Sequence, residues 1–147
     1  MSLDKKTRVN ELAQHFGQGR DARYWGYFAC FNEQRFYEAH DVLESLWLER
    51  RKCAEANFYK GLIQLAGAFV HMQKGRLRPA AALLERATFY LQQYPEETEG
   101  LSLPEVLALA AQWLNDLRDG AYAVNPWGWR SPPRLPWPRP DSHTDAT

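Results

Sequence analysis

The sequence has no surplus of either charge. Lysine and arginine total 18, aspartate and glutamate also total 18, and the formal net charge is zero. Because binding to nucleic-acid phosphates needs a basic surplus or stripe, we expect no nucleic-acid partner. The 147 residues, 45% of them hydrophobic, are enough for one domain with a proper core and too few for two.

The sequence also lacks a hydrophobic run that could span a membrane. Its longest apolar stretch, residues 61–72, is interrupted by Gln64 and His71. It falls short of the roughly 20 residues that a transmembrane helix needs, so we expect no membrane span. Residues 1–10 are charged and have no apolar stretch, so we expect no secretory signal there.

Cysteine is scarce, and no CxxC spacing or glycine-rich phosphate loop is present. The two cysteines, Cys30 and Cys53, are expected to be buried reduced thiols rather than a disulfide framework. This expectation favours a cytoplasmic protein.

Apolar residues instead recur at helical spacing over nearly the whole chain, and no segment alternates with a period of two. The pattern predicts helices over about residues 3–16, 21–31, 35–51, 56–74, 79–94 and 102–120. Asp21 and Ser102 are expected to cap two of them, and Asn32 to supply the left-handed turn after another. We therefore expect an all-α, single-domain bundle of about five to six helices with a central antiparallel helix pair.

We divide the chain into an N-terminal helix (residues 1–20), a bundle (21–120) and a tail rich in proline and tryptophan (121–147). Proline cannot sustain a helix in the tail, so we expect it to be extended, with its last residues disordered. Three tail tryptophans, Trp127, Trp129 and Trp137, either pack on the bundle or a neighbouring subunit, or belong to a docking peptide. The aggregation risk of exposed tryptophans favours packing.

The predicted helix over residues 35–51 has one apolar face with a polar border. At about 100° per residue, the apolar face holds Phe36, Ala39, Val42, Leu43, Leu46 and Trp47. His40 and Glu44 lie four residues apart on one border, and Glu38 and Asp41 lie further round. A carboxylate one turn from an imidazole can hold its tautomer, raise its basicity or share a metal with it.

The predicted helix over residues 56–74 is apolar nearly all round, which places it in the middle of the bundle. Its exceptions, Lys60, Gln64, Gly67 and His71, follow a spacing of four, three and four, so they form one stripe. Because an unpartnered buried polar group costs about 1–3 kcal/mol, this stripe predicts polar groups opposite it.

The preceding helix can supply those groups, because a short connection makes the two helices antiparallel neighbours. Counting from the connection places Glu44 level with Gln64, and His40 level with Gly67. His71 lies about 5 Å further along. We expect these residues to form a polar seam between the two helices.

The seam has two interpretations. One is a metal site formed by His40, Glu44, His71 and Glu38, a donor set that suits zinc, iron or manganese. The other is a buried network, with His40 bonded to Glu44 and His71 to Gln64, that fixes the register of the helices. The sequence has neither the HExxH of zinc proteases nor the ExxH of di-iron bundles, which favours the network.

Two segments, FNEQRFYEAHDVLESLW (residues 31–47) and YKGLIQLAGAFVHMQKG (59–75), resemble the small helical family called domain of unknown function 309. The resemblance implies a compact helical bundle, and some members carry the label "predicted metal-dependent hydrolase". By position, the motif residues here are Asn32, Glu38, His40, Asp41, Glu44, Trp47, Gln64 and His71. The sequence has Asp41 where the family often has Glu, and Gln34 where Gly is common.

Three hypotheses for the function remain open. The first is a non-catalytic helical domain, a homodimer whose seam sets register or binds a small-molecule ligand. The second is a metal-dependent hydrolase, with His40, His71, Glu44 and Glu38 as ligands and a remaining carboxylate as general base. The third is a protein-interaction adaptor that uses the proline and tryptophan tail.

Overall fold

Five α-helices, numbered α2 to α6, form most of the part of the chain that the computed structural model describes, residues 19–141. They are α2 (Ala22–Asn32), α3 (Phe36–Glu49), α4 (Ala56–Gln73), α5 (Leu77–Leu91) and α6 (Leu103–Asp119). Strands β1 (Glu97–Thr98) and β2 (Leu101–Ser102) form a small antiparallel pair, and a 3₁₀ turn, η1, covers Pro126–Gly128. The predicted all-α bundle is confirmed. The helix predicted over residues 3–16 lies outside the described residues.

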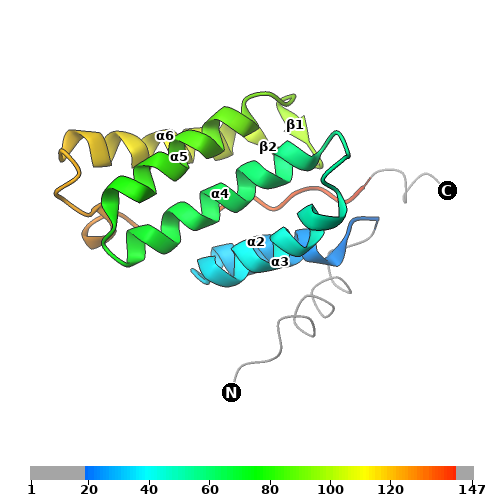
Figure 1. Ribbon diagram of the computed structural model, residues 1–147, viewed down its shortest axis with the longest axis horizontal. Helices are drawn as coiled ribbons and strands as arrows, with labels where there is room; N and C mark the ends of the chain where they lie inside the picture. Colours follow the sequence, from blue (N-terminus) through cyan, green and yellow to red (C-terminus); the bar gives the residue numbers. More distant parts are fainter. Residues whose placement is uncertain (1–18, 142–147) are drawn as a thin grey trace, which may run out of the picture.

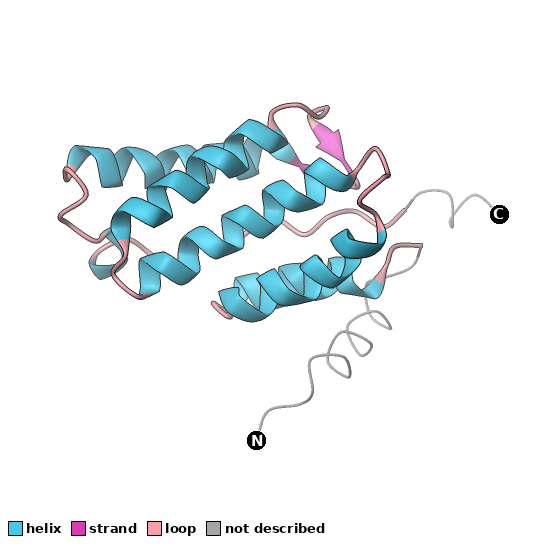
Figure 2. Ribbon diagram, in the orientation of Figure 1, coloured by secondary structure: helices cyan, strands magenta, loops and turns pink. Residues whose placement is uncertain are grey.

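Helix α4 lies between α3 on one side and α5 on the other (Figure 1 and Figure 2). Its side chains at Phe58, Leu62, Leu65 and Phe69 are fully buried, as expected for a helix that is apolar nearly all round. Gly61 allows α5 to approach closely, because a Cβ atom built there would lie 2.8 Å from Leu91 Cγ. None of the helices within residues 19–141 is long and apolar enough to cross a membrane.

The helix ends agree with the predicted signals in most places. The Asp21 carboxylate accepts a hydrogen bond from the Arg23 backbone N–H at 2.8 Å, so Asp21 caps α2 as predicted. Gly75 ends α4 with a φ of +72°, a left-handed conformation that glycine adopts without steric cost. At the turn after α2 the prediction was wrong: Asn32 is helical, and Gln34 has the positive φ of +66°.

The segment between α5 and α6 also departs from the prediction. Helix α5 ends at Leu91 rather than near Tyr94, and the Tyr94 hydroxyl donates to the Ala54 carbonyl at 2.8 Å. The two short strands follow, each too short to show a period-two pattern. Ser102 is the N-cap residue of α6, but its side chain makes no capping hydrogen bond there.

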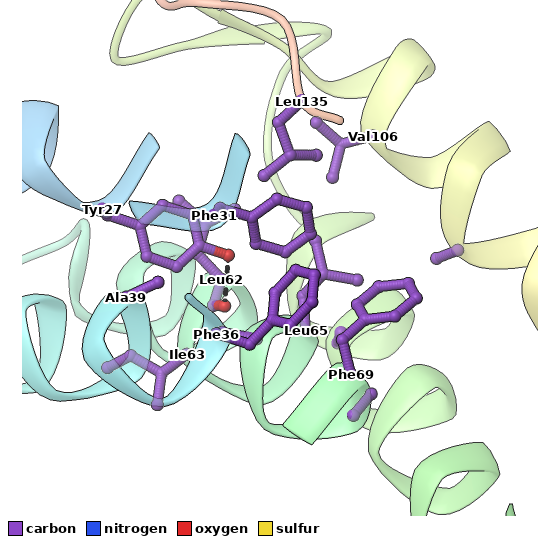
Figure 3. Close-up of a cluster of buried hydrophobic side chains, with 14 of the residues drawn as sticks. Tyr27, Phe31, Phe36, Ala39, Leu62, Ile63, Leu65, Phe69, Val106 and Leu135 are labelled. Atoms are coloured by element: carbon purple, nitrogen blue, oxygen red, sulfur yellow. Dashed lines mark hydrogen bonds between the residues drawn. The ribbon is translucent and has the colours of Figure 1, made fainter. Parts of the chain in front are cut away.

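Aromatic side chains from α2, α3 and α4 make the centre of the core (Figure 3). Phe31 packs edge-on against both Phe36 and Phe69, with ring centroids 4.9 and 5.7 Å apart. Such edge-to-face pairs add to the stability that burial alone provides. The Tyr27 hydroxyl, also buried, donates to the Leu62 carbonyl at 2.6 Å, which ties α2 to α4.

The C-terminal tail closes the side of the bundle between α2 and α6. Leu135 is buried and lies with Phe31 and Val106 (Figure 3). Trp127 packs against Phe36 with ring centroids 5.9 Å apart, whereas Trp129 stays 62% exposed. Packing on the bundle, the favoured interpretation of the tail, is therefore observed for Trp127 but not for Trp129. Residues 142–147, expected to be disordered, lie outside the described residues.

The two cysteines lie in different environments. Cys30 is buried in α2, as expected, but Cys53 is exposed in the loop between α3 and α4. The expectation of two buried thiols was therefore wrong for Cys53, because a loop at the end of the bundle has no core to face. Neither cysteine is in a disulfide.

Candidate functional site

Helix α3 presents a short polar surface beside its buried face. Ala39 and Leu43 are fully buried, while His40, Asp41 and Glu44 are half-buried at the border. One ligand atom from each of these three residues lies within 4.8 Å of the other two. The border therefore brings an imidazole and two carboxylates together within about one turn of helix.

Helix α4 carries the stripe that the sequence spacing indicates. Lys60, Gln64, Gly67 and His71 are all half-buried, in a helix whose other side chains are mostly buried. The stripe therefore lies at the surface of α4 that neither α3 nor α5 covers completely.

A pocket of about 220 Å³ lies over the middle of this stripe, between α3, α4 and α5. Its polar lining residues are Tyr37, His40, Gln64 and His71, and its other lining residues are Ile63, Gly67, Val70 and Leu83. The seam expected between α3 and α4 is thus an open pocket, and α5 supplies one wall of it through Leu83.

Gly67 makes room for the pocket. A Cβ atom built at this position would lie 3.9 Å from His40 Cδ2 and 3.2 Å from Leu83 Cδ1. His40 and Gly67 are therefore level with one another, in agreement with the register counted from the short connection. A larger side chain at position 67 would occupy space that now belongs to the pocket.

The His71 side chain has an unsatisfied hydrogen-bonding atom. Its Nδ1 atom is buried and, among the described residues, has no hydrogen-bond partner. Burial lowers the pKa of the His71 imidazole below its ordinary value of 6.5, and the positive charges of Arg76 and Lys74 lower the pKa further. His71 is therefore a neutral imidazole at pH 7, able to donate from one ring nitrogen and accept at the other.

The two hydrogen bonds of the predicted network are not formed between the described residues. The hydrogen-bond contact of His40 that the structure shows is with Asp41, at 3.4 Å from Nδ1 to Oδ1, rather than with Glu44. No hydrogen bond joins the Gln64 and His71 side chains in the described part of the chain, and the buried His71 Nδ1 has no partner there. The expected pairing fails because residues one or two turns apart on a helix can share a border without their polar atoms meeting.

The Lys60 and Trp47 side chains meet outside the pocket. The Lys60 ammonium lies 5.2 Å from the centroid of the Trp47 ring and 5.8 Å from that of Tyr90. Cation–π contacts of this kind contribute about 0.5–1 kcal/mol at exposed sites. Lys60 therefore joins α3, α4 and α5 at one end of the stripe.

Two further residues of the sequence motif lie away from the pocket. Glu38 pairs with Arg35, whose Nε atom donates to Oε1 at 2.8 Å. Asn32 binds the tail instead, donating to the Leu135 carbonyl at 3.0 Å. The structure does not bring Glu38 or His71 into the cluster of His40, Asp41 and Glu44.

Some lining residues were not among the candidate site residues chosen from the sequence. Tyr37 lies one turn before His40, a spacing that places both side chains on the same surface of α3. Leu83 comes from α5, and no pattern within α5 indicates which of its residues reaches the surface of α4. Helical spacing could therefore have placed Tyr37 beside His40, but it could not have placed Leu83 at the pocket.

The fold and the pocket define a helical bundle whose central helix carries a half-buried polar stripe. Residues 24–83 match the family model described as "Domain of unknown function (DUF309)". This segment runs from α2 into α5 and contains every residue that lines the pocket. The chain resembles this family, as its two motifs predict.

A protein of Aquifex aeolicus (strain VF5), described as an uncharacterized protein, is 29% identical to this chain over 107 residues. The match covers 69% of this chain and 31% of that protein, so the chain spans about a third of the length of the relative. No solved structure matches the chain.

Proposed function

We propose that the protein binds a small molecule in the pocket between α3, α4 and α5. The observation that carries this proposal is the buried Nδ1 atom of His71, which has no hydrogen-bond partner among the described residues. Leaving such a group unsatisfied costs about 1–3 kcal/mol. His71 also lines the pocket, so a rotation of its imidazole that turns Nδ1 toward a ligand would recover this free energy on binding.

The other features of the pocket support the same function. Ligand pockets are mostly apolar with a few convergent polar groups, and here Ile63, Val70 and Leu83 provide the apolar walls. The space is kept open by Gly67, the one position of the stripe without a side chain.

A substitution that fills the pocket tests this function. We expect Gly67→Leu to abolish the binding of small fragments that shift the amide resonances of residues 64–71 in ¹H–¹⁵N NMR spectra. The matched control is Ala82→Leu, which adds the same side chain at an exposed position of α5. If no fragment shifts these resonances in the wild-type protein, or if Gly67→Leu binds as well as the control, the pocket is not a binding site.

A purely structural seam, the other part of the first hypothesis, makes a different prediction. If His71 only sets the register of the helices, His71→Ala lowers the stability of the protein, because the contacts that fix the register are lost. Fragments would then leave the resonances of the pocket unchanged in both the wild type and the variant.

A second function is favoured by the cluster of His40, Asp41 and Glu44. Two donors on one transition-metal ion lie at most about 4.4 Å apart, so donor atoms within 4.8 Å need only small side-chain rotations to share an ion. An imidazole with two carboxylates suits zinc, iron or manganese. Such an ion lowers the pKa of a bound water, which is the chemistry of a metal-dependent hydrolase.

Metal binding is tested by elemental analysis and by the melting temperature with added zinc, manganese or iron(II). We expect His40→Ala to lose the bound metal and the rise in melting temperature, while His71→Ala keeps both, since His71 is not part of the cluster. The metal-dependent function is excluded if the wild-type protein holds no metal and no added ion raises its melting temperature.

We also propose that the chain forms a homodimer in the cytoplasm. Tyr37, Leu48 and Phe89 are large hydrophobic side chains that are at least half exposed, and a second copy of the chain would cover them if they form one continuous apolar patch. Neither cysteine forms a disulfide, which fits a reducing compartment. Light scattering after size exclusion measures the mass, and a monomer at all concentrations would contradict the dimer.

A further inference from the structure

From the lining of this pocket we infer that its ligand is an uncharged, planar molecule that carries both hydrogen-bond donors and acceptors, such as an aromatic amide or a single-ring heterocycle. The inference rests on the proposed small-molecule function and names the chemical class of the ligand. It does not depend on the metal cluster on α3.

The charge of the lining excludes ionic ligands. Among the described residues, no lysine, arginine, aspartate or glutamate lines the pocket. Burying a charged group without a partner is costly, so a carboxylate or ammonium group would lose its hydration there without compensation. Charges of both signs lie close to lining residues, with Asp41 and Glu44 beside His40, and Lys74 and Arg76 close enough to affect His71. These charges favour neither an anionic nor a cationic ligand.

The polar groups of the lining can both donate and accept hydrogen bonds. The Gln64 amide offers a donor and an acceptor, and a neutral imidazole at His71 does the same. These two residues lie seven apart on α4 and line the same pocket, so a ligand between them meets both kinds of group. A molecule with a donor and an acceptor in one plane can bond to both residues, whereas a hydrocarbon makes no hydrogen bond to either.

The shape of the lining favours a flat ligand. The rings of Tyr37 and His40 are inclined by only 22°, with their centroids 6.5 Å apart, and both line the pocket. Aromatic faces bind flat ligands by stacking, and Val70 and Leu83 supply apolar contacts from α4 and α5.

The volume limits the size of the ligand. Pockets for drug-sized molecules have volumes of about 300–1,000 Å³, and this pocket has about 220 Å³. It therefore suits one ring with a polar substituent, and not a nucleotide with its ribose and phosphates.

A set of matched probes tests each part of the inference by ¹H–¹⁵N NMR titration at pH 7.5. Benzamide and nicotinamide are planar and uncharged. Benzoate and benzylammonium add a charge, cyclohexanecarboxamide removes the planarity, and toluene removes the hydrogen bonds. We expect the two aromatic amides to shift the amide resonances of Gln64, Gly67 and His71, and to bind at least ten-fold more tightly than the other four probes.

Variants of the pocket identify the groups that bind. We expect Gln64→Leu and His71→Phe each to weaken nicotinamide binding roughly five- to thirty-fold, the factor that corresponds to one lost hydrogen bond. Gln92→Leu, a change at an exposed glutamine, is the control and should bind like the wild type. Melting temperatures of the variants show whether each one is folded. If His71→Phe does not fold, the binding affinity of Gln64→Leu tests the inference.

The outcomes separate this inference from the proposed function. Tighter binding of benzoate, benzylammonium, cyclohexanecarboxamide or toluene at the same resonances overturns the ligand class and leaves a binding pocket in place. Binding of the aromatic amides that Gln64→Leu and His71→Phe do not weaken also overturns it. If none of the six probes shifts these resonances, both the inference and the proposed function fail.

Discussion

Asn32 and Leu135, far apart in the sequence, are joined by two hydrogen bonds. The Asn32 side-chain amide donates to the Leu135 carbonyl at 3.0 Å, and its carbonyl oxygen accepts from the Leu135 N–H at 2.7 Å. The side chain thus pairs with one residue of the tail as a neighbouring β-strand would. It places the buried Leu135 side chain against the core.

We expect Asn32→Ala to destabilise the protein by about 1–3 kcal/mol, because it leaves two backbone groups of the tail without partners and loosens Leu135. Urea unfolding followed by tryptophan fluorescence measures the change. Asn115→Ala, at an exposed position of α6, is the matched control and should change the stability little. Equal stability of the two variants would show that the two hydrogen bonds do not hold the tail.

Two glycines of α4 should respond differently to alanine. A Cβ atom at position 61 would lie 2.8 Å from both Leu91 Cγ and Leu91 Cδ2, where Leu91 is fully buried. Overpacking of this kind costs about 1–3 kcal/mol, so we expect Gly61→Ala to lower the free energy of unfolding despite the better helix propensity of alanine.

At position 67 the nearest atom, Leu83 Cδ1 at 3.2 Å, belongs to a side chain that is only half-buried and can move. We therefore expect Gly67→Ala to be neutral or to gain up to about 1 kcal/mol of helix propensity. Calorimetry of the two variants gives the comparison. A larger loss for Gly67→Ala than for Gly61→Ala would contradict the packing described for α4 and α5.

The stability of the protein should depend on the protonation of His71. Because its pKa is lowered in the folded state, the unfolded state binds the proton more tightly. The contribution of neutral His71 is therefore present above the ordinary pKa of 6.5 and is lost as the pH falls through the lower pKa of the folded state.

NMR titration of the imidazole resonances measures this pKa directly, and the spectrum of His71→Gln identifies which resonance belongs to His71. We expect a midpoint below 6.5. We also expect the wild type to lose stability relative to His71→Gln as the pH falls below 6.5. A midpoint at or above 6.5 would show that burial does not penalise the imidazolium.

The two cysteines should differ in reactivity. Cys53 is exposed and Cys30 is buried, so we expect Ellman's reagent to label one thiol rapidly in the folded protein and two in denaturant. Cys53→Ser should remove the rapid phase, and Cys30→Ser should keep it. Rapid labelling of both thiols in the folded wild type would contradict the burial of Cys30.

Helical periodicity was enough to predict which faces of α3 and α4 are buried. Ala39, Val42, Leu43 and Leu46 lie in the core as their spacing indicates, because a stripe of apolar side chains must be removed from water on one side of the helix. The same reasoning located the Lys60–His71 stripe and the level of Gly67 beside His40.

Hydrogen bonds between side chains were not predictable in this way. Spacing places His40 and Glu44 on one border, but rotamers and neighbouring groups decide which polar atoms meet, and His40 contacts Asp41 instead. The role of Asn32 depends on the tail, which lies far away in the sequence.

The sequence alone therefore determined the class of the fold, the buried faces of its helices and the polar stripe on α4, since each follows from local periodicity and the cost of exposing apolar surface. Only the tertiary structure decided that the stripe borders a pocket, because the walls come from three helices whose relative positions are set by core packing. It also decided that the Nδ1 atom of His71 has no hydrogen-bond partner within residues 19–141, since the satisfaction of a buried atom depends on every group packed around it.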